Sequence, residues 1–558
     1  MKLKKLMTSG LALAMLAGCS SGGGSAAAGS GSSSGGGSKG AGKSAVVQLD
    51  ADLNTMDYEV ATDGASFAMQ TMCESGLTEL DEKGQPKPDL AESWDVSEDH
   101  KTYTFHLRDA KWSNGDPVTA ADFVYGWQRL VSPGLASEYN FLASTVCIEN
   151  AAECISGDKP VTDLGVEAKD DKTFVVHLTQ PVAFFLGLTA FPSFFPLNQK
   201  FFESQGGDLD GGASGTFAQS TDGMLYCGPY TMTDWVTGSE YTFKKNADYW
   251  DADNYGDSVD EVTFRFQQDT ATAMMEFDSG KFDIVKLTSE LVDQYKDKEG
   301  FTNRLTGYAW RLDFNFDDPT IKNENLRKAI MYGIDRQTIC DDVLKDGSVA
   351  AEGFIPKDFA FGPDSKDYRD TAGKIVEFDA AKAGEYYEKA KAELGGDVKL
   401  ELLCEDSESS QNVALNIKSM LEKNLPGSTF DLKVVPKKTR LDSMTHHEYQ
   451  IGLTRWGPDY ADPQTYMDLM KSDVPGYNGS YSNDEYNALM NKAETGEDAA
   501  DAEKRWADIV EAEKLLIDDA AMVPVYQNGG AYMISTDIEE GVQFHNAGVD
   551  NYRHIVKA

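Results

Sequence analysis

Short stretches of the chain alternate between hydrophobic and polar residues, which predicts β-strands. In 102–107, Tyr103, Phe105 and Leu107 share one face, and threonine and histidine residues occupy the other. Successive side chains of a strand point to opposite faces, so this alternation is typical of a strand with one buried face. By similar reasoning we predict strands at 46–49, 173–178, 230–235, 241–244, 282–285, 399–403, 430–435 and 522–526.

Between these strands, hydrophobic residues recur with the spacing of an α-helix. The clearest example is 502–519, where large apolar side chains fall within an arc of roughly 120°, the width of one helix face. These side chains are Trp506, Ile509, Val510, Leu516 and Ile517. Further helices are predicted at 122–131, 270–280, 325–332 and 412–424. Strand, helix and strand follow one another over 399–435, so the sequence predicts a fold of mixed α/β layers.

Two segments are predicted to be loops. Asn114-Gly115 is a strong signal for a tight hairpin turn, because both central residues of such a turn need a positive φ. Segment 206–221 is polar and rich in glycine, which predicts a mobile insertion at the surface.

The first nineteen residues have the pattern of an export signal. Three lysines among the first five residues form a basic head, and the apolar stretch 11–17 is too short to span a bilayer. The stretch runs through Leu-Ala-Gly into Cys19, which resembles the lipobox of bacterial lipoproteins. The resemblance implies that 1–18 is a lipoprotein signal peptide and that Cys19 carries a diacylglycerol after cleavage. The alternative is an ordinary secretory signal that happens to precede a cysteine.

Residues 20–44 contain only serine, glycine, alanine and lysine. Such a segment cannot bury enough apolar surface to fold, so we predict a disordered linker. Segment 19–44 would thus be the lipidated cysteine followed by this linker. A flexible chain of this composition spans about 25–30 Å. It would hold a folded body away from the membrane while letting that body reorient.

Length and charge narrow the class of protein. The chain has 558 residues, a length that predicts about two to four domains. Hydrophobic residues make up 41% of the chain, which is enough to build hydrophobic cores. Its 51 basic and 92 acidic residues give a net charge of -41. Such a surface repels phosphate backbones, which argues against nucleic-acid partners. It also repels anionic membranes, so any membrane attachment needs something other than electrostatics. The acidity serves either solubility or a preference for cationic ligands, and net charge alone does not separate the two.

Six cysteines follow Cys19, and outside the cytoplasm they are free to form disulfides. Only Cys147 and Cys154 are close in sequence, so they are the pair predicted to form a local bridge. The other four are scattered and suit buried thiols. No C-x-x-C pair occurs, which gives no support for a zinc ribbon or a thioredoxin-like site.

A search for catalytic motifs finds little. The body of the chain holds no H-E-x-x-H motif, no P-loop and no dinucleotide-binding glycine pattern. His446 and His447 are adjacent, and adjacent side chains point apart, so they make a poor metal pair. The acidic run 251–256 begins like a calcium loop but has Tyr255 at a ligand position. Missing motifs do not exclude catalysis, but nothing in the sequence favours it, and we predict no enzymatic activity, no metal and no cofactor.

A series of short motifs occurs in a fixed order along the body of the chain. The first are Pro-Asp-Leu-Ala-Glu-Ser-Trp at 88–94, the strand at 102–108, and Ala-Lys-Trp-Ser-Asn-Gly-Asp-Pro at 110–117. Later ones are found at 228–230, 246–250, 326–336 and 456–460. Together they resemble the extracytoplasmic solute-binding proteins of the oligopeptide/dipeptide ABC transporter family (family 5), and most closely its oligopeptide-binding members. The resemblance covers 45–558.

This resemblance implies a two-lobed α/β clamshell with an additional α/β domain. Lobe I would be discontinuous and consist of 45–75, 199–308 and 527–558. The additional domain would be 76–198, and lobe II would be 309–526. In this family the ligand lies between the lobes, which close over it by a hinge motion. The protein then hands the ligand to a membrane permease that a cytoplasmic ATPase drives.

The ligand-binding residues that the resemblance implies centre on the Trp-Gly-Pro-Asp-Tyr motif. A permissive peptide receptor bonds what peptides share: the backbone, as an added β-strand, and the terminal ammonium, through a carboxylate. The family places that carboxylate in this motif, which assigns it to Asp459. Trp456 would flank the ligand backbone, with Gly457 beside it. Alternatively, Asp459 caps a turn before Pro463.

Other parts of the implied site are more divergent. Tyr139 matches a cleft tyrosine of the additional domain, with core packing as the alternative. The family's arginine three residues before the motif's tryptophan is Leu453 here. The carboxylate end of a ligand is therefore expected to be read differently, with Lys437, Arg440 or Arg455 as its cationic partner.

Taken together, we predict a monomeric substrate-binding lipoprotein of an ABC importer, lipid-anchored at the extracytoplasmic face of the cell membrane. Its partners would be short peptides and the permease subunits. Dipeptides, nickel chelates and other small solutes are alternative ligands for the same fold, although a carboxylate at Asp459 favours a free amino group. Alternatives of another class are a surface lipoprotein hydrolase and a peptide-pheromone sensor.

Overall fold

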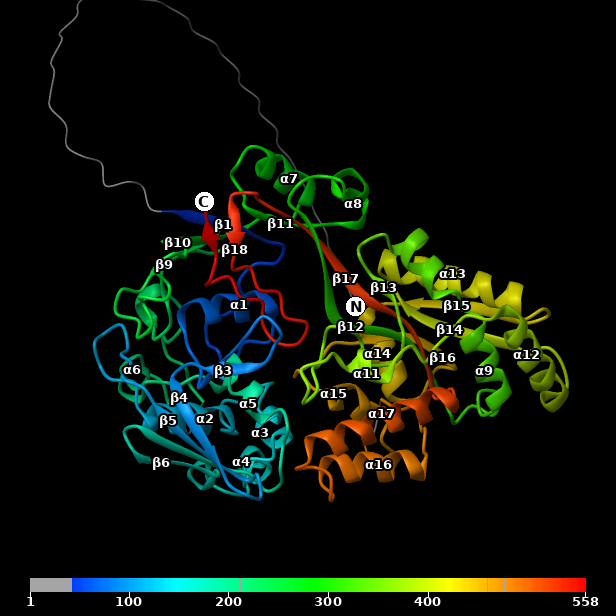
Figure 1. Ribbon diagram of the computed structural model, residues 1–558, viewed down its shortest axis with the longest axis horizontal. Coiled ribbons are helices and arrows are strands. Elements are labelled where there is room, and N and C mark those ends of the chain that lie inside the picture. The colour runs from blue at the N-terminus through cyan, green and yellow to red at the C-terminus, as the bar shows by residue number, and fades with distance from the viewer. Residues whose placement is uncertain (1–42, 210–211, 459, 473, 475–476) are drawn as a thin grey trace, which may run out of the picture. The chain divides into compact units, whose positions relative to one another are not determined.

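The computed structural model describes residues 43–209, 212–458, 460–472, 474 and 477–558 (Figure 1). The predicted signal peptide, Cys19 and most of the predicted linker lie outside the described residues, and so does Asp459. The first strand, β1, begins at Ser44, where the predicted linker ends.

The largest sheet in the described part of the chain is mixed and has eleven strands. Their order is β15-β14-β16-β12-β17-β11-β1-β10-β9-β8, with β13 added to β17. The bounds are β1 (Ser44–Leu49), β8 (Tyr230–Val236), β9 (Glu240–Lys245), β10 (Glu261–Phe266), β11 (Ile284–Leu287), β12 (Phe301–Phe314), β13 (Val349–Ala350), β14 (Lys399–Glu405), β15 (Thr429–Val435), β16 (Ile451–Trp456) and β17 (Met522–Ile534).

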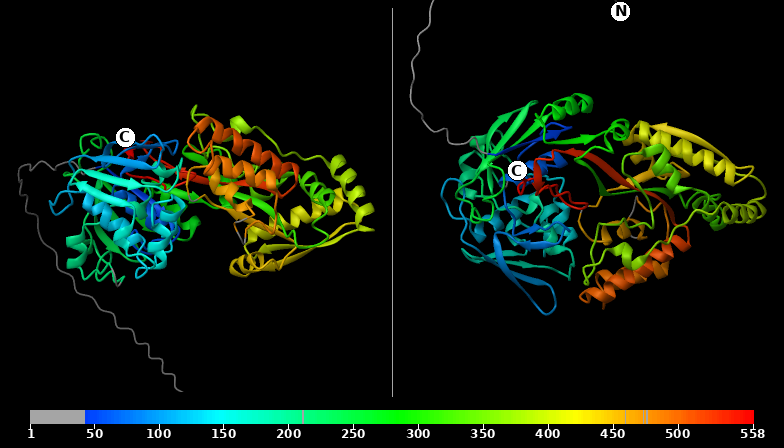
Figure 2. Two further views of the ribbon diagram at one scale, coloured as in Figure 1. Left: turned by 90° about the horizontal axis from the view of Figure 1, so that it is seen from below. Right: turned by 45° about the horizontal axis from the view of Figure 1, so that its top comes forward.

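Two long strands, β12 and β17, join the two halves of this sheet (Figures 1 and 2). They are 14 and 13 residues long and pair antiparallel with each other. At one end β12 also pairs with β16, and at the other end β17 pairs with β11. Their register shifts between Leu305 and Ala309 and again between Trp310 and Arg311. The backbone ladder therefore continues from one half to the other and is irregular where the halves meet.

A second sheet, antiparallel, has the order β4-β5-β7-β6. Its strands are β4 (Ala91–Val96), β5 (Thr102–Leu107), β6 (Val166–Asp170) and β7 (Thr173–His177). Helix α2 (Ala120–Leu130) covers it, and Phe123 and Trp127 of α2 pack on Phe174 of β7. Two short pairs, β2 (Thr78–Leu80) with β3 (Pro86–Pro88) and β18 (Ile538–Glu540) with β19 (Val556–Lys557), complete the described strands.

The longer helices begin at residues whose side chains accept a hydrogen bond from the first helical turn. Examples are Asn323, Asp379, Ser407 and Asp501, which cap α9, α12, α13 and α17. The α-helices not yet given are α1 (Gly64–Cys73), α3 (Phe141–Thr145), α4 (Ala151–Ser156), α5 (Phe185–Leu188), α6 (Gln199–Ser204), α7 (Thr270–Asp278), α8 (Ser289–Tyr295), α9 (Glu324–Tyr332), α10 (Arg336–Thr338), α11 (Tyr368–Ala372), α12 (Ala380–Leu394), α13 (Glu408–Asn424), α14 (Lys437–Thr445), α15 (Gln464–Met467), α16 (Asp484–Glu494) and α17 (Ala502–Asp518).

Three large hydrophobic cores use different stretches of the chain. One is built from residues between 309 and 526, with Ala547 added. The second is built from residues between 77 and 194, with Cys227 and Tyr460 added. The third combines the first strand and helix with residues between 195 and 284 and the C-terminal segment. The division into lobe II, additional domain and lobe I stays a prediction, and below we use these names for the predicted segments.

The predicted elements agree well with the observed ones where the hydrophobic pattern is strong. Strand 102–107 is β5 with the same bounds. The predicted strand, helix and strand over 399–435 are β14, α13 and β15, and the two strands pair in parallel. The predicted hairpin at Asn114-Gly115 is a tight turn with Gly115 at φ 88°, but only the single bridge between Lys111 and Pro117 flanks it.

The glycine-rich segment 206–221 differs from its prediction as a mobile insertion. Phe217 within it is buried in the core of lobe I, where its ring packs edge-on against Phe202. Ser214 donates a hydrogen bond to the buried Asp57. One aromatic and one hydroxyl side chain thus attach a segment whose average composition is polar.

The predicted Cys147–Cys154 bridge is wrong in this structure, because both thiols are free. Cys147 has a positive φ of 57°, and its Sγ lies 3.6 Å from the carbonyl oxygen of Thr145. Cys154 is buried on α4, and its Sγ lies 3.3 Å from the carbonyl oxygen of Pro160. The turn and helix between the two cysteines direct the side chains to different partners.

Among the described residues, the structure contains no helix with the length and apolar character needed to cross a membrane.

A buried charge cluster ties the additional domain to lobe I. Arg129 of α2 donates to both carboxylate oxygens of Asp57, at 2.8 and 2.7 Å, and also to Glu59. The three side chains are 1%, 6% and 0% exposed. A buried charge is tolerated only when it is paired, so each of these groups requires the others.

We expect Arg129→Met to lower the free energy of unfolding by about 3–5 kcal/mol, because it leaves two carboxylates buried without a cation. The matched control is Arg265→Met, since Arg265 pairs with Glu240 at the surface. That control should change the stability by less than about 1 kcal/mol. Urea unfolding followed by circular dichroism measures both. Equal losses in the two variants would contradict the assigned role of the cluster.

Candidate functional site

A cleft of about 530 Å³ lies where lobe I, the additional domain and lobe II meet. Most of its lining comes from lobe I, including the end of β1, the start of α1 and the loop that follows β18. The additional domain contributes Tyr139 and Phe191, and lobe II contributes Gly457 and Pro458. The cleft therefore brings together two residues that the sequence singled out, Tyr139 and Gly457.

The end of β1 and the start of α1 form one wall of the cleft. Gln48, Leu49 and Asp50 lie at the carboxyl end of β1, which pairs in parallel with β10. Ligands of α/β sheets bind outside the carboxyl ends of such strands. Asp63 also lines the cleft and caps α1 by accepting a 2.9 Å hydrogen bond from the backbone N–H of Ser66.

Charged groups on this wall are paired with each other. Lys286 donates to Asp50 at 2.8 Å, and Arg304 donates to Asp550 at 2.6 Å. Burial alone would lower the pKa of Lys286, but Tyr532 and Asp50 outweigh it and the pKa is raised. In the described part of the chain, no group of three or more His, Cys, Asp or Glu side chains could hold a metal ion. The two cations of this wall are thus balanced, and Asp63 adds one further carboxylate.

Three aromatic rings form the wall next to the additional domain. The ring centroids of Tyr139 and Phe191 lie 5.5 Å apart and the rings are stacked, while Phe67 of α1 meets them at 5.5 and 4.9 Å. Tyr139 also packs against the core of the additional domain. Tyr139 therefore both lines the cleft and packs on the core, the two roles considered for it from the sequence.

On the lobe II side, the chain leaves β16 and enters the cleft at Gly457. A side chain at this position would overlap the ring of Tyr308, which is exposed and would have to shift. Trp456 is the last residue of β16, and its Nε1 donates to Thr465 at 3.3 Å. As far as the described residues show, Gly457 and Pro458 line the cleft and Trp456 lies just outside it.

The chain beyond Asp459 is attached to the additional domain. The ring of Tyr460 stacks on Phe184, with centroids 3.8 Å apart and an interplanar angle of 7°. Asp462 receives two hydrogen bonds from Arg505 of α17, at 2.9 and 2.7 Å. Both described neighbours of Asp459 are thus held in place, Pro458 on the cleft wall and Tyr460 on the additional domain.

The predicted cationic partners of a ligand carboxylate occupy different environments. Arg455 donates to Glu405 at 2.6 Å and stacks on Trp310, and Arg440 donates to the same carboxylate at 3.5 Å. Both arginines are therefore already paired within lobe II. Lys437, the first residue of α14, is exposed.

The lobe I wall is the part of the site that sequence reasoning missed. Gln48, Asp50, Lys286 and Arg304 come from segments far apart in the chain, and pairing between distant strands brings them together. The carboxyl end of a predicted parallel strand was the available signal, since ligands bind at such ends. That signal would have indicated Gln48 and Asp50, but not their partners.

Comparison with known proteins agrees with this geometry. Residues 85–478 match the family described as bacterial extracellular solute-binding proteins, family 5 Middle. The dipeptide-binding protein DppE of Bacillus subtilis is 30% identical over 98% of both chains. The peptide-bound structure of Listeria monocytogenes OppA is 34% identical, with a TM-score of 0.70 over 93% of this chain and 99% of that one.

A further solved structure is the unliganded open form of the murein tripeptide-binding protein MppA. It is 27% identical and has a TM-score of 0.79 over 92% of this chain and 97% of that one. These similarities confirm the predicted fold class, a two-lobed α/β binding protein. Because the matching proteins are substrate-binding proteins, the prediction that the chain is not an enzyme is also confirmed. The chain belongs to the bacterial extracellular solute-binding proteins of family 5.

Proposed function

We propose that this protein captures oligopeptides in the cleft and delivers them to the permease of an ABC importer. Its relatives are named dipeptide-binding and oligopeptide-binding proteins, and one of the similar structures is bound to a peptide. The observation that carries the proposal is the meeting of Gly457 and Pro458 with the carboxyl end of β1 across the cleft. A peptide lying there would contact backbone from both lobes.

The last residues of β16, Arg455 and Trp456, are half-buried and lack a strand partner on one side, next to the cleft residues Gly457 and Pro458. β12 pairs with all six residues of β16, whereas β14 pairs with it only at Ile451 and Gly452. Among the described strands, therefore, none pairs with Leu453–Trp456 on the side of β14. An extended peptide can satisfy such an edge by main-chain hydrogen bonds that are independent of its side chains. The balanced cations of the lobe I wall are consistent with a receptor that accepts varied side chains.

Asp459 is the proposed partner of the peptide's terminal ammonium. It follows Pro458, which lines the cleft, and precedes Tyr460, which is fixed to the additional domain. A carboxylate that becomes enclosed without a cation is costly, so the ammonium of a ligand would favour closure of the lobes. A dipeptide has the same ammonium, so dipeptides are the second candidate ligands, as the name of DppE also suggests.

Lys437 is the proposed partner of the ligand carboxylate. Arg440 and Arg455 donate to Glu405, whereas Lys437 is exposed at the start of α14, near the same carboxylate and outside the cleft lining. A helix N-terminus favours an anion near it, which adds to the attraction of the lysine.

We expect Asp459→Asn to weaken the binding of a peptide with a free amino terminus by about 3–5 kcal/mol, because the ammonium loses its counter-ion. Binding of the N-acetylated form of the same peptide should change little. Isothermal titration calorimetry measures both. Asp253→Asn is the matched control, since Asp253 is exposed and carries the same charge. The anchor role would be refuted by equal affinities of Asp459→Asn and the unaltered protein for the free-amine peptide.

We also propose that Cys19 carries the lipid that anchors the protein to the extracytoplasmic face of the cell membrane, and that the protein works there as a monomer. The support is the lipobox-like sequence before Cys19, the glycine- and serine-rich segment after it, and the extracellular family. A lipid at Cys19 and a flexible linker after it would hold the folded receptor near the permease and leave it free to reorient.

We expect Cys19→Ala to abolish incorporation of radiolabelled palmitate and to move the protein from the membrane fraction to the soluble fraction, because a soluble body then has no lipid. Cell fractionation with immunoblotting measures the shift, and Cys73→Ala serves as the control because Cys73 is buried in the folded body. Retention of Cys19→Ala in the membrane fraction, with unchanged labelling, would rule out lipidation at this residue.

A further inference from the structure

Extra residues of β12 form a bulge in the ladder that β12 makes with β17. Leu305 pairs with Gly529, and the next paired residue of β12 is Ala309, opposite Gln527. Between these two pairs β12 advances from 305 to 309, whereas β17 advances only from 529 to 527. The residues in between, 306–308, line the cleft, and we call them the β12 bulge.

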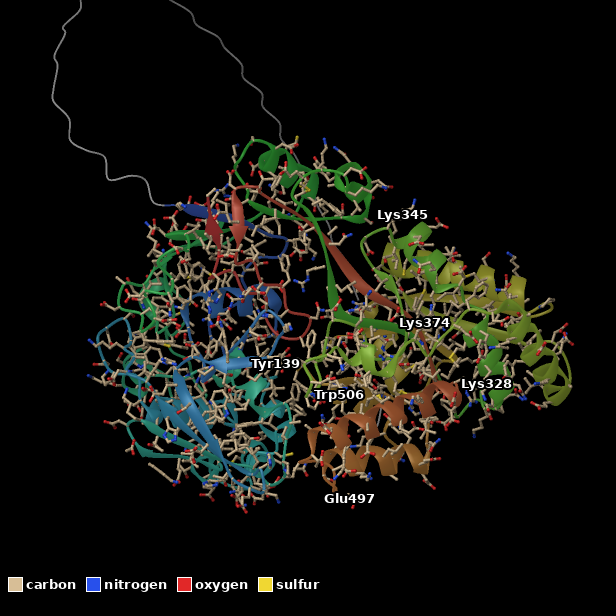
Figure 3. All side chains as sticks on the ribbon, viewed as in Figure 1. Tyr139, Lys328, Lys345, Lys374, Glu497 and Trp506 are labelled. Atoms are coloured by element: carbon tan, nitrogen blue, oxygen red, sulfur yellow. The ribbon has the colours of Figure 1, made fainter. Side chains whose placement is uncertain are left out.

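The β12 bulge packs against the lobe II side of the cleft. A side chain added at Gly307 would overlap the ring of Pro458, and one added at Gly457 would overlap the ring of Tyr308. Tyr139, which Figure 3 labels, lines the same cleft from the additional domain. The position of the bulge therefore affects the shape of the cleft, and it affects the segment that leads to the proposed ammonium partner.

Two buried side chains supply hydrogen bonds to the carbonyl oxygens of the bulge. The oxygen of Thr306 accepts a 3.0 Å hydrogen bond from Nε2 of Gln527, and the oxygen of Gly307 accepts one from the hydroxyl of Tyr466. Gln527 is 3% exposed and Tyr466 is 0% exposed. Because an unpaired buried carbonyl group is costly, these side chains hold the bulge where the ladder does not.

The side-chain amide of Gln527 uses both of its ends. Its Nε2 also donates to the carbonyl oxygen of Lys357 at 2.9 Å, and its Oε1 accepts from the backbone N–H of Lys357 at 3.2 Å. The reverse orientation would turn an oxygen toward two carbonyl oxygens, so only this one gives three hydrogen bonds. One side chain of β17 thus joins the β12 bulge to a loop of lobe II.

We propose that Gln527 is a positioning residue for ligand binding, which holds the β12 bulge in the cleft wall and ties it to the lobe II loop at Lys357. The proposal rests on the proposed function, in which a peptide occupies the cleft. Gln527 is not among the described residues that line the cleft, so it acts through 306–308 and does not touch the ligand. Without its amide the bulge shifts and the peptide binds less tightly.

The test replaces the amide by a carboxyl group of the same shape, in Gln527→Glu. At high pH this group is ionised and has no donor for the carbonyl oxygens of Thr306 and Lys357, whereas at low pH it is protonated and has one. Charged residues that line the small cavity beside position 527 are Glu352, Lys357 and Arg369, and Arg369 is already paired with Glu513. Thermal melting checks that the variant folds.

Calorimetry with tetraalanine measures the peptide affinity at pH 8 and pH 5.5. We expect Gln527→Glu to bind about tenfold or more weakly than the unaltered protein at pH 8, and to recover most of this loss at pH 5.5. Gln450→Glu is the matched control. Gln450 also joins a strand to a loop, through Glu401 and Asp318, but does not line the cleft. This control should lose stability and keep its affinity.

A second variant, Gln527→Met, keeps the length of the side chain and has no donor at any pH. We expect it to bind tetraalanine about tenfold or more weakly at both pH values. In the peptide-free protein, hydrogen–deuterium exchange over 305–309 should be faster in Gln527→Met and unchanged in Gln450→Glu.

The positioning role would be overturned by equal affinities of Gln527→Glu and the unaltered protein at pH 8, by a loss that does not recover at pH 5.5, or by an equal loss in Gln450→Glu. Unchanged exchange over 305–309 in Gln527→Met would also overturn it. If the unaltered protein does not bind tetraalanine, the proposed function fails, and the exchange measurement alone decides whether Gln527 holds the bulge.

Discussion

The antiparallel pairing of β12 with β17 is the constraint on which the rest of the structure depends. It is the ladder that carries one sheet from lobe I into lobe II, and its register shift falls where the cleft opens. Thr306, Gly307 and Tyr308 lie in this irregular stretch and line the cleft. A side chain at Gly307 would overlap Pro458 and the carbonyl oxygen of Asn546. Glycine at position 307 in the interrupted ladder thus permits the close approach of Pro458 from lobe II.

The same interruption explains how both lobes contribute to one site. Strands on the lobe I side present their carboxyl ends to the cleft, and β16 on the lobe II side releases Gly457 and Pro458 into it. Ion pairs balance the two cations of the lobe I wall, because Lys286 pairs with Asp50 and Arg304 pairs with Asp550. Under the proposed function, recognition would then rest on backbone and termini, which vary least among peptides.

How much of this could be predicted from sequence differs between local and long-range features. Strand 102–107 was predicted with its observed bounds because the alternation of Tyr103, Phe105 and Leu107 is a local signal. Phe217 was missed because one aromatic residue does not alter the composition of a polar, glycine-rich segment, yet it anchors that segment. The Cys147–Cys154 bridge was wrong because Cys147 lies in a turn and Cys154 on helix α4, where the two thiols face different carbonyl oxygens. Gly457 and Tyr139 came from the family resemblance, whereas the partners of Asp50 depend on strand pairings that no local pattern encodes.

The buried cluster of Arg129, Asp57 and Glu59 has a consequence for how this fold can be taken apart. Cutting the additional domain away would strand an arginine on one fragment and two carboxylates on the other, all in surfaces shaped to exclude water. Neither piece would keep its native surface without redesign at these positions. The additional domain is therefore not an interchangeable accessory. The buried ion pairs join the additional domain to lobe I. A design that transfers either segment to another scaffold must therefore include Arg129, Asp57 and Glu59.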